Sequence, residues 1–214
     1  MEDFLTILRN DHHNFDKGKI SDHVPKDPND FFNKWYKEAF QSTENEPNAM
    51  VLSTVNEEHK PSSRILYLKE LNQDGFIFFT NYNSHKGKDL LHNKNASLLF
   101  FWPTLERQVR IEGTVEKTSS SISDEYFESR PKESQLGAWA SHQSDYLESR
   151  IDLENRLKSL MNEYPEKVPR PQHWGGYVLK ALRFEFWQGR PSRLHDRIIY
   201  ENQGHNWIIH RLNP

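Results

Sequence analysis

Five short segments rich in β-branched and aromatic residues follow one another between residues 49 and 117, and they constrain the fold more than any other feature. They read AMVLSTV (49–55), SRILYLK (63–69), FIFFT (76–80), SLLFFW (97–102) and RQVRIEGTVEK (107–117). This composition is typical of strands, and the stretches NEEHKP and NQDG between the first three are typical of tight turns. Short strands joined by short turns pair antiparallel, and closure into a barrel removes exposed edges. The segments therefore predict an antiparallel β-barrel.

Strands return at the end of the chain, and helices are predicted elsewhere. The last strands are GGYVLKALRFEFWQG (175–189), RIIYEN (197–202) and WIIHRL (207–212), with a turn at Gly204. Apolar residues have helical spacing in DFFNKWYKEAFQ (30–41), where Asp30 is the expected cap, and SHKGKDLLHN (84–93) is expected to be capped near Ser84. Further helices are expected over 120–130, 134–140 and 144–164, with a break at Pro131 and caps at Ser144 and Asp145. The prediction is an α+β fold in which residues 30–214 form a single domain and the polar residues 1–29 form a mobile arm.

Composition excludes several classes of function. The net charge of −3 argues against a general binder of nucleic acids or membrane surfaces, so any basic cluster must serve a local purpose. The chain has no cysteine, which excludes disulfides and thiolate chemistry. The eleven histidines form no H-E-x-x-H or other tight ligand set, so no metal site is expected. The short acidic start MEDFLTILRND and the lack of a long apolar run predict a cytoplasmic protein.

Cations occur repeatedly beside hydroxyl and amide side chains. The segments are SSRILYLK (62–69), TNYNSHKGK (80–88), ERQVR (106–110), YFESRPKES (126–134), SHQS (141–144) and WQGRPSRLHDR (187–197). Arginine forks, lysine charges and hydroxyl donors are what a phosphate monoester requires, because it has nearly two negative charges and three acceptor oxygens. No Walker loop, G-x-G-x-x-G or G-x-S-x-G motif accompanies them. The pattern indicates binding of phosphate groups by side chains from several segments.

Each cluster taken alone could also consist of solvated surface residues or core residues, and several features argue against a shared site. In a regular strand Arg64 and Lys69 face opposite sides, so they serve different ligands unless a bulge intervenes. Pro131 ends the helix that carries Tyr126, so Ser134 need not lie on the same face. Trp187 is of a residue type that more often belongs to the core than to a ligand site. Only the number of separate clusters favours a common purpose.

Taken together, these segments resemble the pyridoxamine 5′-phosphate oxidase family from about Asp27 to Pro214. The most specific pieces are SSRILYLKE, FFTN, LERQVRIEG, YFESRP, SQLGAWASHQS, HWGG, EFWQGRPSRLHDR and the terminal RLNP. The resemblance implies a flavin mononucleotide (FMN)-binding split β-barrel with flanking helices and a homodimer with FMN at the subunit interface. It also implies oxidation of pyridoxine or pyridoxamine 5′-phosphate to pyridoxal 5′-phosphate in vitamin B6 metabolism. A hydride passes from the substrate C4′ to flavin N5, and O2 is reduced to H2O2.

The same resemblance implies roles for individual residues. FMN contacts are assigned to Arg64, Ile65, Leu66, Tyr67, Leu68, Lys69, Phe79, Thr80, His85, Lys86, Gln108, Gln143, Ser144, Trp187 and Arg197. The substrate phosphate is assigned to Lys69, Tyr126, Arg130 and Ser134. Further substrate contacts are assigned to Arg193, Leu194 and His195, with Arg193 and His195 at the pyridine end as the catalytic residues. Two phosphate monoesters in one cleft carry about four negative charges, and this charge would account for the many basic residues.

Two departures from the family pattern are visible. His85 stands where the family usually has arginine, and the start of the chain reads RNDHHNF instead of an Arg-x-x-Tyr motif, so that Arg9 and Phe15 receive no role. Two alternatives stay open: an FMN oxidase acting on another ring, as in phenazine-type biosynthesis, and a non-catalytic protein that binds pyridoxal 5′-phosphate or flavin. The preference between amine and alcohol substrates also stays open.

Overall fold

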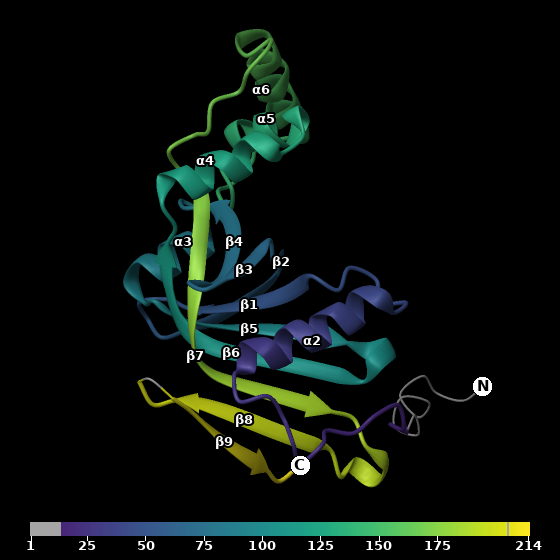
Figure 1. Cartoon of the computed structure of the whole chain (residues 1–214). Helices are drawn as coiled ribbons and strands as arrows, with labels where there is room; N and C mark the ends of the chain where they lie inside the picture. The colour runs from purple at the N-terminus through teal and green to yellow at the C-terminus, as the bar shows by residue number, and fades with distance from the viewer. Residues whose placement is uncertain (1–13, 205) are drawn as a thin grey trace, which may run out of the picture. The chain divides into compact units, whose positions relative to one another are not determined.

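The structure is a computed structural model that describes residues 14–204 and 206–214, and the chain in it divides into two compact units (Figure 1). Unit 1 comprises Met1–Pro47, Leu99–Ile111 and Arg183–Pro214, and unit 2 comprises Asn48–Leu98 and Glu112–Leu182. The strands β5 (Asn95–Trp102), β6 (Arg107–Lys117) and β7 (Trp174–Gln188) each pass from one unit to the other. Neither unit is therefore a continuous stretch of sequence, and the single domain over 30–214 stays a prediction.

The strands form a nine-stranded sheet. The other strands are β1 (Ala49–Val55), β2 (Pro61–Tyr67), β3 (Glu70–Asn72), β4 (Gly75–Asn81), β8 (Asp196–Asn202) and β9 (Trp207–Leu212). Their order is β2-β1-β5-β6-β7-β4-β3, with β8 paired to β7 and to β9. Antiparallel register is seen for β1 with β2, β3 with β4, β4 with β7, β7 with β8, and β8 with β9. The predicted antiparallel sheet is confirmed, and β3, with only three residues, was too short to predict.

Whether Arg64 and Lys69 must face opposite sides of one strand depends on where β2 ends. The strand stops at Tyr67, and the backbone N–H of Lys69 donates to the carbonyl of Ile77, 3.0 Å away. The two-residue alternation of a strand therefore no longer applies at Lys69.

The helix predicted over 30–41 is α2 (Pro28–Gln41), and its cap differs from the prediction. The Asp27 carboxylate accepts from the N–H of Asn29 at 2.8 Å, and Pro28 occupies the first turn, where its missing N–H has no cost. Asp30 lies in the first turn and is not the cap, so that prediction was wrong. The apolar face of α2 packs within unit 1, where the rings of Phe31 and Phe186 stack with centroids 4.2 Å apart.

The remaining helices follow the predicted breaks more closely than the predicted caps. Ser84 caps α3 (His85–His92), and Pro131 separates α4 (Ser120–Ser129) from α5 (Lys132–Ala140), both as predicted. The last helix, α6 (Arg150–Glu163), begins after Ser149 and not at the predicted caps Ser144 and Asp145. The Ser149 hydroxyl accepts from the Asp152 N–H at 3.2 Å and donates to its carboxylate at 2.7 Å, a reciprocal cap that fixes the start.

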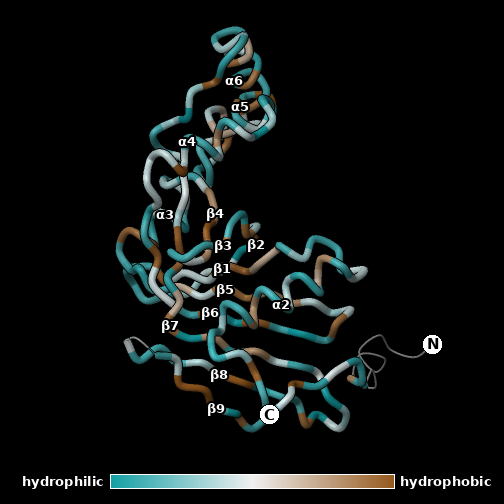
Figure 2. Tube along the Cα trace, in the orientation of Figure 1, coloured by the Kyte–Doolittle hydropathy of each residue, from teal (hydrophilic) through white to brown (hydrophobic). Residues whose placement is uncertain are grey.

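Hydrophobic residues are spread along the strands and α2 and are not gathered in one long segment (Figure 2). In unit 2 a buried cluster of Phe127, Leu136, Val168 and Trp174 holds α4 and α5 to the start of β7. Among the described helices, none has the length and apolar character needed to cross a membrane.

The predicted arm is described only in part, because residues 1–13, including Arg9, His12 and His13, lie outside the described residues. Residues 14–27 contain no helix or strand. Ile20 is buried, its N–H donates to the Asp196 carboxylate at 3.0 Å, and the Tyr200 hydroxyl donates to the Pro25 carbonyl at 2.8 Å. This stretch is thus tied to unit 1, and the mobility of the arm stays a prediction.

Candidate active site

A first cavity, of about 400 Å³, lies in unit 2, and we call it the cationic cavity. It is lined by Ser62, Ser63, Arg64, Ile65, Leu66, His85, Lys86, Gln143 and Ser144. The sequence brings these residues from three places: β2, the start of α3, and the loop after α5. Two cations and three hydroxyls on one wall favour an anionic ligand.

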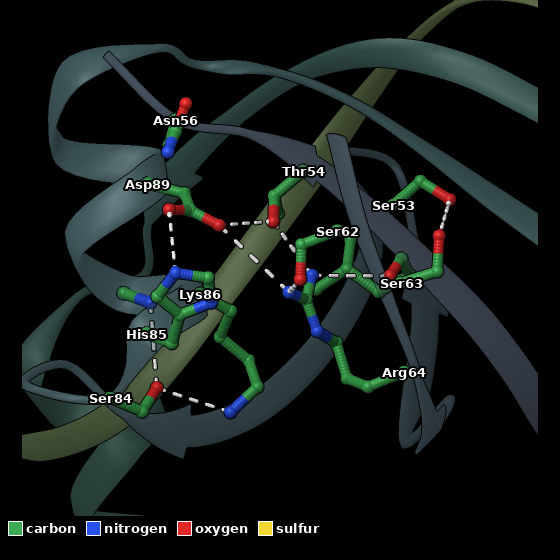
Figure 3. Close-up of polar contacts among 12 residues, drawn as sticks. Ser53, Thr54, Asn56, Ser62, Ser63, Arg64, Ser84, His85, Lys86 and Asp89 are labelled. Atoms are coloured by element: carbon green, nitrogen blue, oxygen red, sulfur yellow. Dashed lines mark hydrogen bonds and ion pairs between the residues drawn. The ribbon is translucent and has the colours of Figure 1, made fainter. Parts of the chain in front are cut away.

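Arg64 is held in one orientation by neutral oxygens (Figure 3). Its Nη1 donates to the Leu52 carbonyl at 3.2 Å and to the Thr54 hydroxyl at 2.7 Å, and its Nη2 donates to the Ser62 hydroxyl at 2.6 Å. Burial lowers the pKa of Arg64, and the nearby carboxylate of Asp89 partly opposes this. The guanidinium is thus preorganised, and the three oxygens that accept these hydrogen bonds carry no charge to neutralise it.

Lys86 is the most buried cation of the cavity, with 6% of its surface exposed. Its Nζ donates to Ser84 at 3.1 Å, Gln143 at 3.2 Å and Thr80 at 3.3 Å, all of which are neutral oxygens. Burial, and then the charge of Arg64, lower the pKa of Lys86 to about 8. A buried ammonium without a bonded carboxylate is costly, and a bound anion would offset that cost.

A second cavity, of about 420 Å³, also lies in unit 2, and we call it the aromatic cavity. It is lined by Leu66, Tyr67, Lys69, Phe79, Thr80, Asn81, Tyr126, Arg130, Ser134, Gly137, Ala138, Ser141, Gln143 and Trp174. Leu66 and Gln143 line both cavities, so the two are adjacent. All four side chains predicted to hold a substrate phosphate line this second cavity. The turn at Pro131 therefore brings Ser134 to the same cavity as Tyr126, which resolves the question left open by the sequence.

Arg130 has an unsatisfied hydrogen-bond donor in this cavity. Its guanidinium carbon lies 4.5 Å from the ring centroid of Trp174 and 5.5 Å from that of Phe127. Its Nη1 is buried and has no hydrogen-bond partner within the part of the chain that the structure describes. Burial lowers the pKa of Arg130. An unpaired buried donor costs about 1–3 kcal/mol, so an acceptor that reached this atom would stabilise the site.

Three parallel rings form one wall of the aromatic cavity. The centroids of Phe79 and Tyr126 are 3.9 Å apart, and those of Phe79 and Trp174 are 5.7 Å apart. The sequence analysis missed Trp174, although the two glycines that follow it are a usable signal. A Cβ atom at Gly176 would lie 2.9 Å from the Phe79 ring, so this packing requires glycine there.

The other predicted site residues line neither cavity. Leu68 is buried in the core, and its N–H donates to the Asn48 carbonyl at 2.9 Å. The six that belong to unit 1 are Gln108, Trp187, Arg193, Leu194, His195 and Arg197. Gln108 lies half-buried on β6. Arg197 binds the buried carboxylate of Glu185, with Nη2 at 2.7 Å from Oε1.

Around His195 the chain makes a tight turn, the short helix η2 (Pro191–Arg193). Ser192 and Arg193 have positive φ angles of 59° and 61°, which side-chain-bearing residues rarely adopt and which cluster at functional sites. The Nδ1 atom of His195 accepts from the Arg190 N–H at 3.1 Å, so a neutral imidazole carries its proton on Nε2. Burial, and then the charge of Arg193, lower the pKa of His195. His195 therefore presents a proton donor at Nε2 when it is neutral.

Comparison with known proteins identifies relatives along nearly the whole chain. The family model described as "Pyridoxamine 5'-phosphate oxidase" matches residues 36–158, and that of the "Pyridoxine 5'-phosphate oxidase C-terminal dimerisation region" matches residues 174–214. A pyridoxine/pyridoxamine 5′-phosphate oxidase of Bordetella pertussis is 54% identical over 202 residues, which cover 94% of this chain and 96% of that protein. A protein of the same name from Burkholderia thailandensis is 50% identical over 215 residues, covering 98% of this chain and all of that protein.

Solved structures agree with the sequence relatives. PhzG from Burkholderia lata, in complex with tetrahydrophenazine-1-carboxylic acid, has a TM-score of 0.86 at 31% identity and covers 90% of this chain and 95% of its own. A pyridoxamine 5′-phosphate oxidase-related, FMN-binding protein from Nostoc punctiforme has a TM-score of 0.71 at 16% identity, covers 89% of this chain and all of its own, and supports the fold alone. The α+β split-barrel prediction is thus confirmed. With relatives at 50–54% identity and the cavities described above, this chain belongs to the pyridoxamine 5′-phosphate oxidase family.

Proposed function

We propose that this protein is an FMN-dependent oxidase that converts pyridoxamine or pyridoxine 5′-phosphate into pyridoxal 5′-phosphate, with O2 as the electron acceptor and H2O2 as the by-product. The observation that carries the proposal is the aromatic cavity, which is lined by Lys69, Tyr126, Arg130 and Ser134, with Nη1 of Arg130 buried and without a partner among the described residues. A ring substrate without a phosphate group would leave these groups unused.

The cationic cavity fits the phosphate of FMN. Arg64 and Lys86 supply charge, serine residues line the same cavity, and among the described residues the hydrogen-bond partners of the buried Lys86 ammonium are neutral oxygens. When bound, FMN supplies the two-electron chemistry by taking up a hydride and giving its electrons to O2. The protein's part is to bind and orient the two phosphates and to keep the reacting groups at contact distance.

The substrate phosphate is assigned to the aromatic cavity. The charges of Arg130 and Lys69 and the hydroxyls of Tyr126 and Ser134 line this cavity and provide the contacts expected for a dianion. The stacked rings of Phe79, Tyr126 and Trp174 form an apolar wall beside them. Water is thereby excluded from one side of the charged groups, which strengthens their interactions.

The residues of unit 1 keep the roles that the family resemblance implies for them. His195 holds a proton at Nε2, and Arg193 lies in the same exposed turn with its charge available to a ligand. We assign them to the pyridine end of the substrate. Because residues 174–214 match the family's dimerisation region, we also propose a homodimer with FMN at its interface.

The similarity to PhzG favours a second candidate, an FMN oxidase acting on a phenazine-type ring. The phosphate-binding set in the aromatic cavity argues for the first candidate, because a phenazine carboxylate has no phosphate group to engage it.

The test is an assay of the purified protein. We expect yellow flavin absorbance, and in air with pyridoxamine 5′-phosphate we expect equal amounts of aldehyde and peroxide. Colour without turnover would favour a non-catalytic binder. Turnover only with unphosphorylated rings would favour the phenazine-type oxidase.

A further inference from the structure

A buried carboxylate, that of Asp89, lies near the basic residues that line the cationic cavity (Figure 3). It lies on α3 with 3% of its surface exposed and does not line the cavity. One of its oxygens, Oδ2, accepts from the Thr54 hydroxyl at 2.6 Å and lies 3.9 Å from Nη2 of Arg64. The other, Oδ1, lies 3.9 Å from Nε2 of His85. The two oxygens thus lie near two different residues that line the cavity, Arg64 and His85.

The hydroxyl of Thr54 links Asp89 to Arg64. Thr54 is fully buried, and its Oγ1 also accepts from Nη1 of Arg64 at 2.7 Å. A hydroxyl has one proton to donate, and the carboxylate of Asp89 has none, so Thr54 must donate to Asp89. Its lone pairs are then directed at Arg64. The carboxylate therefore fixes the direction of the hydrogen bond that orients the guanidinium.

We propose that Asp89 is a positioning residue of the phosphate-binding site, which orients Arg64 through Thr54 and restrains His85, so that the cationic cavity is preorganised for a phosphate monoester. The inference rests on the proposed function, because it takes the phosphate to be that of FMN. It assigns a purpose to His85 as well. The imidazole that replaces the usual arginine lines the cavity, and its Nε2 lies 3.9 Å from the same carboxylate in an i, i+4 arrangement that becomes an ion pair when His85 is protonated.

Electrostatics supports the same role. The charged and polar groups facing the Lys86 ammonium are Arg64 from β2, Thr80 from β4, Gln143 from the loop after α5, and Ser84 and Asp89 around α3. Burial and Arg64 lower the pKa of Lys86, and Asp89 is the group that raises it. Without the carboxylate, the buried Lys86 and the half-buried Arg64 would repel each other with less compensation. Because Asp89 is outside the cavity wall, it does not compete with the phosphate for their hydrogen bonds.

The first experiment measures FMN affinity of the apoprotein by quenching of flavin fluorescence. We expect Asp89→Asn to raise Kd for FMN about tenfold and Thr54→Val to raise it about fivefold, as expected for charge-assisted contacts. The control is Asp74→Asn, the same change at an exposed aspartate in the turn between β3 and β4 of unit 2, where no change is expected. In the double variant the rise in Kd should be smaller than the product of the two single effects, because both residues act on Arg64 through one relay.

Two further measurements separate positioning from folding. Kd for FMN should rise as the pH increases through about 8, because Lys86 loses its proton there. In Asp89→Asn the rise in Kd should begin at lower pH, because the carboxylate that raises the pKa of Lys86 is gone. Riboflavin, which lacks the phosphate, should lose little affinity in the variant, and the thermal midpoint of the apoprotein shows whether the fold is intact. An unchanged pH profile, or equal losses for FMN and riboflavin, would overturn the inference. Wild-type protein that does not quench FMN fluorescence would instead overturn the proposed function.

Discussion

Three arginines of unit 1 differ from the buried basic residues at the cavities of unit 2 in what accepts their hydrogen bonds. In unit 1, Arg110 and Arg197 both bind the buried carboxylate of Glu185, each at 2.7 Å. Arg107 pairs with Glu38 in the same unit. In the cavities of unit 2, Lys86 is bonded to neutral oxygens, and Arg130 lies against aromatic rings with a buried N–H left over. A cluster of cations therefore predicts an anion site only where carboxylates have not already taken up its hydrogen-bond donors.

This comparison changes how Arg197 is understood. The resemblance assigns it to FMN, but in unit 1 its Nε and Nη2 are engaged by Glu185 and its Nη1 by the Asn213 carbonyl at 3.0 Å. Its contribution within unit 1 is structural, and its contact with FMN stays a prediction. Arg130 shows the opposite case, because its buried Nη1 has no carboxylate or other hydrogen-bond partner within the described residues.

The largest effect is expected at Arg130. Arg130→Ala should lower kcat/KM for pyridoxamine 5′-phosphate by about 100- to 1000-fold, since a desolvated ion pair with the phosphate is lost. The flavin content should stay that of the wild type. Steady-state kinetics and flavin absorbance measure both. Arg150→Ala, at an arginine side chain that is 80% exposed, is the matched control and should leave both unchanged. A loss below about threefold would show that the unpaired guanidinium is no substrate site.

Removing the charge of Glu185 tests the neutralised cluster of unit 1. Glu185→Gln should lower the free energy of unfolding by about 3 kcal/mol, because two partly buried arginines lose their carboxylate. Urea denaturation measures the change. Stability within about 0.5 kcal/mol of the wild type would contradict the assignment of these arginines to the fold.

A third test uses two variants to separate FMN binding from substrate turnover. Lys86→Met should weaken FMN binding by about 30-fold, since a charge-assisted contact to phosphate is removed. Arg193→Ala should depress turnover far more than flavin retention. Flavin content after gel filtration and turnover at saturating FMN provide the two readouts. Equal effects of both changes on flavin content would mean that cofactor and substrate residues have been divided wrongly.

A smaller effect is expected from pH. Burial lowers the pKa of Lys86 to about 8 in the free protein, and phosphate binding requires the charged form. Lys86 is protonated below this pKa and neutral above it, so FMN affinity should fall as pH rises. The fall should be about threefold between about pH 7.5 and about pH 8.5. Fluorescence titration of Lys86→Met over the same range is the control and should show no such fall.

The smallest effect is expected for an exposed ion pair outside both clusters. Glu154→Gln on α6 removes the partner of Arg150 at i, i+4 and should change the free energy of unfolding by less than about 0.5 kcal/mol. A loss like that predicted for Glu185 would show that burial is not what distinguishes the two carboxylates.

Local signals in the sequence determined most of the fold. Strand composition, the Ser84 cap and the helix break at Pro131 all act within a few residues, and the structure confirms them. The caps predicted at Asp30 and at Ser144 and Asp145 were wrong because other capping residues were also within reach. The Asp27 carboxylate accepts from the Asn29 N–H and the Ser149 hydroxyl accepts from the Asp152 N–H, so each helix is capped at that residue.

The sequence by itself therefore determined the elements, the family, and the set of residue types that a phosphate requires. Only the tertiary structure decided which cations are already neutralised. Glu185 reaches Arg110 across 75 positions of sequence, and Asp89 reaches Thr54 across 35. No local pattern encodes such pairs, because a charge is compensated by its neighbours in space and by the water that burial removes.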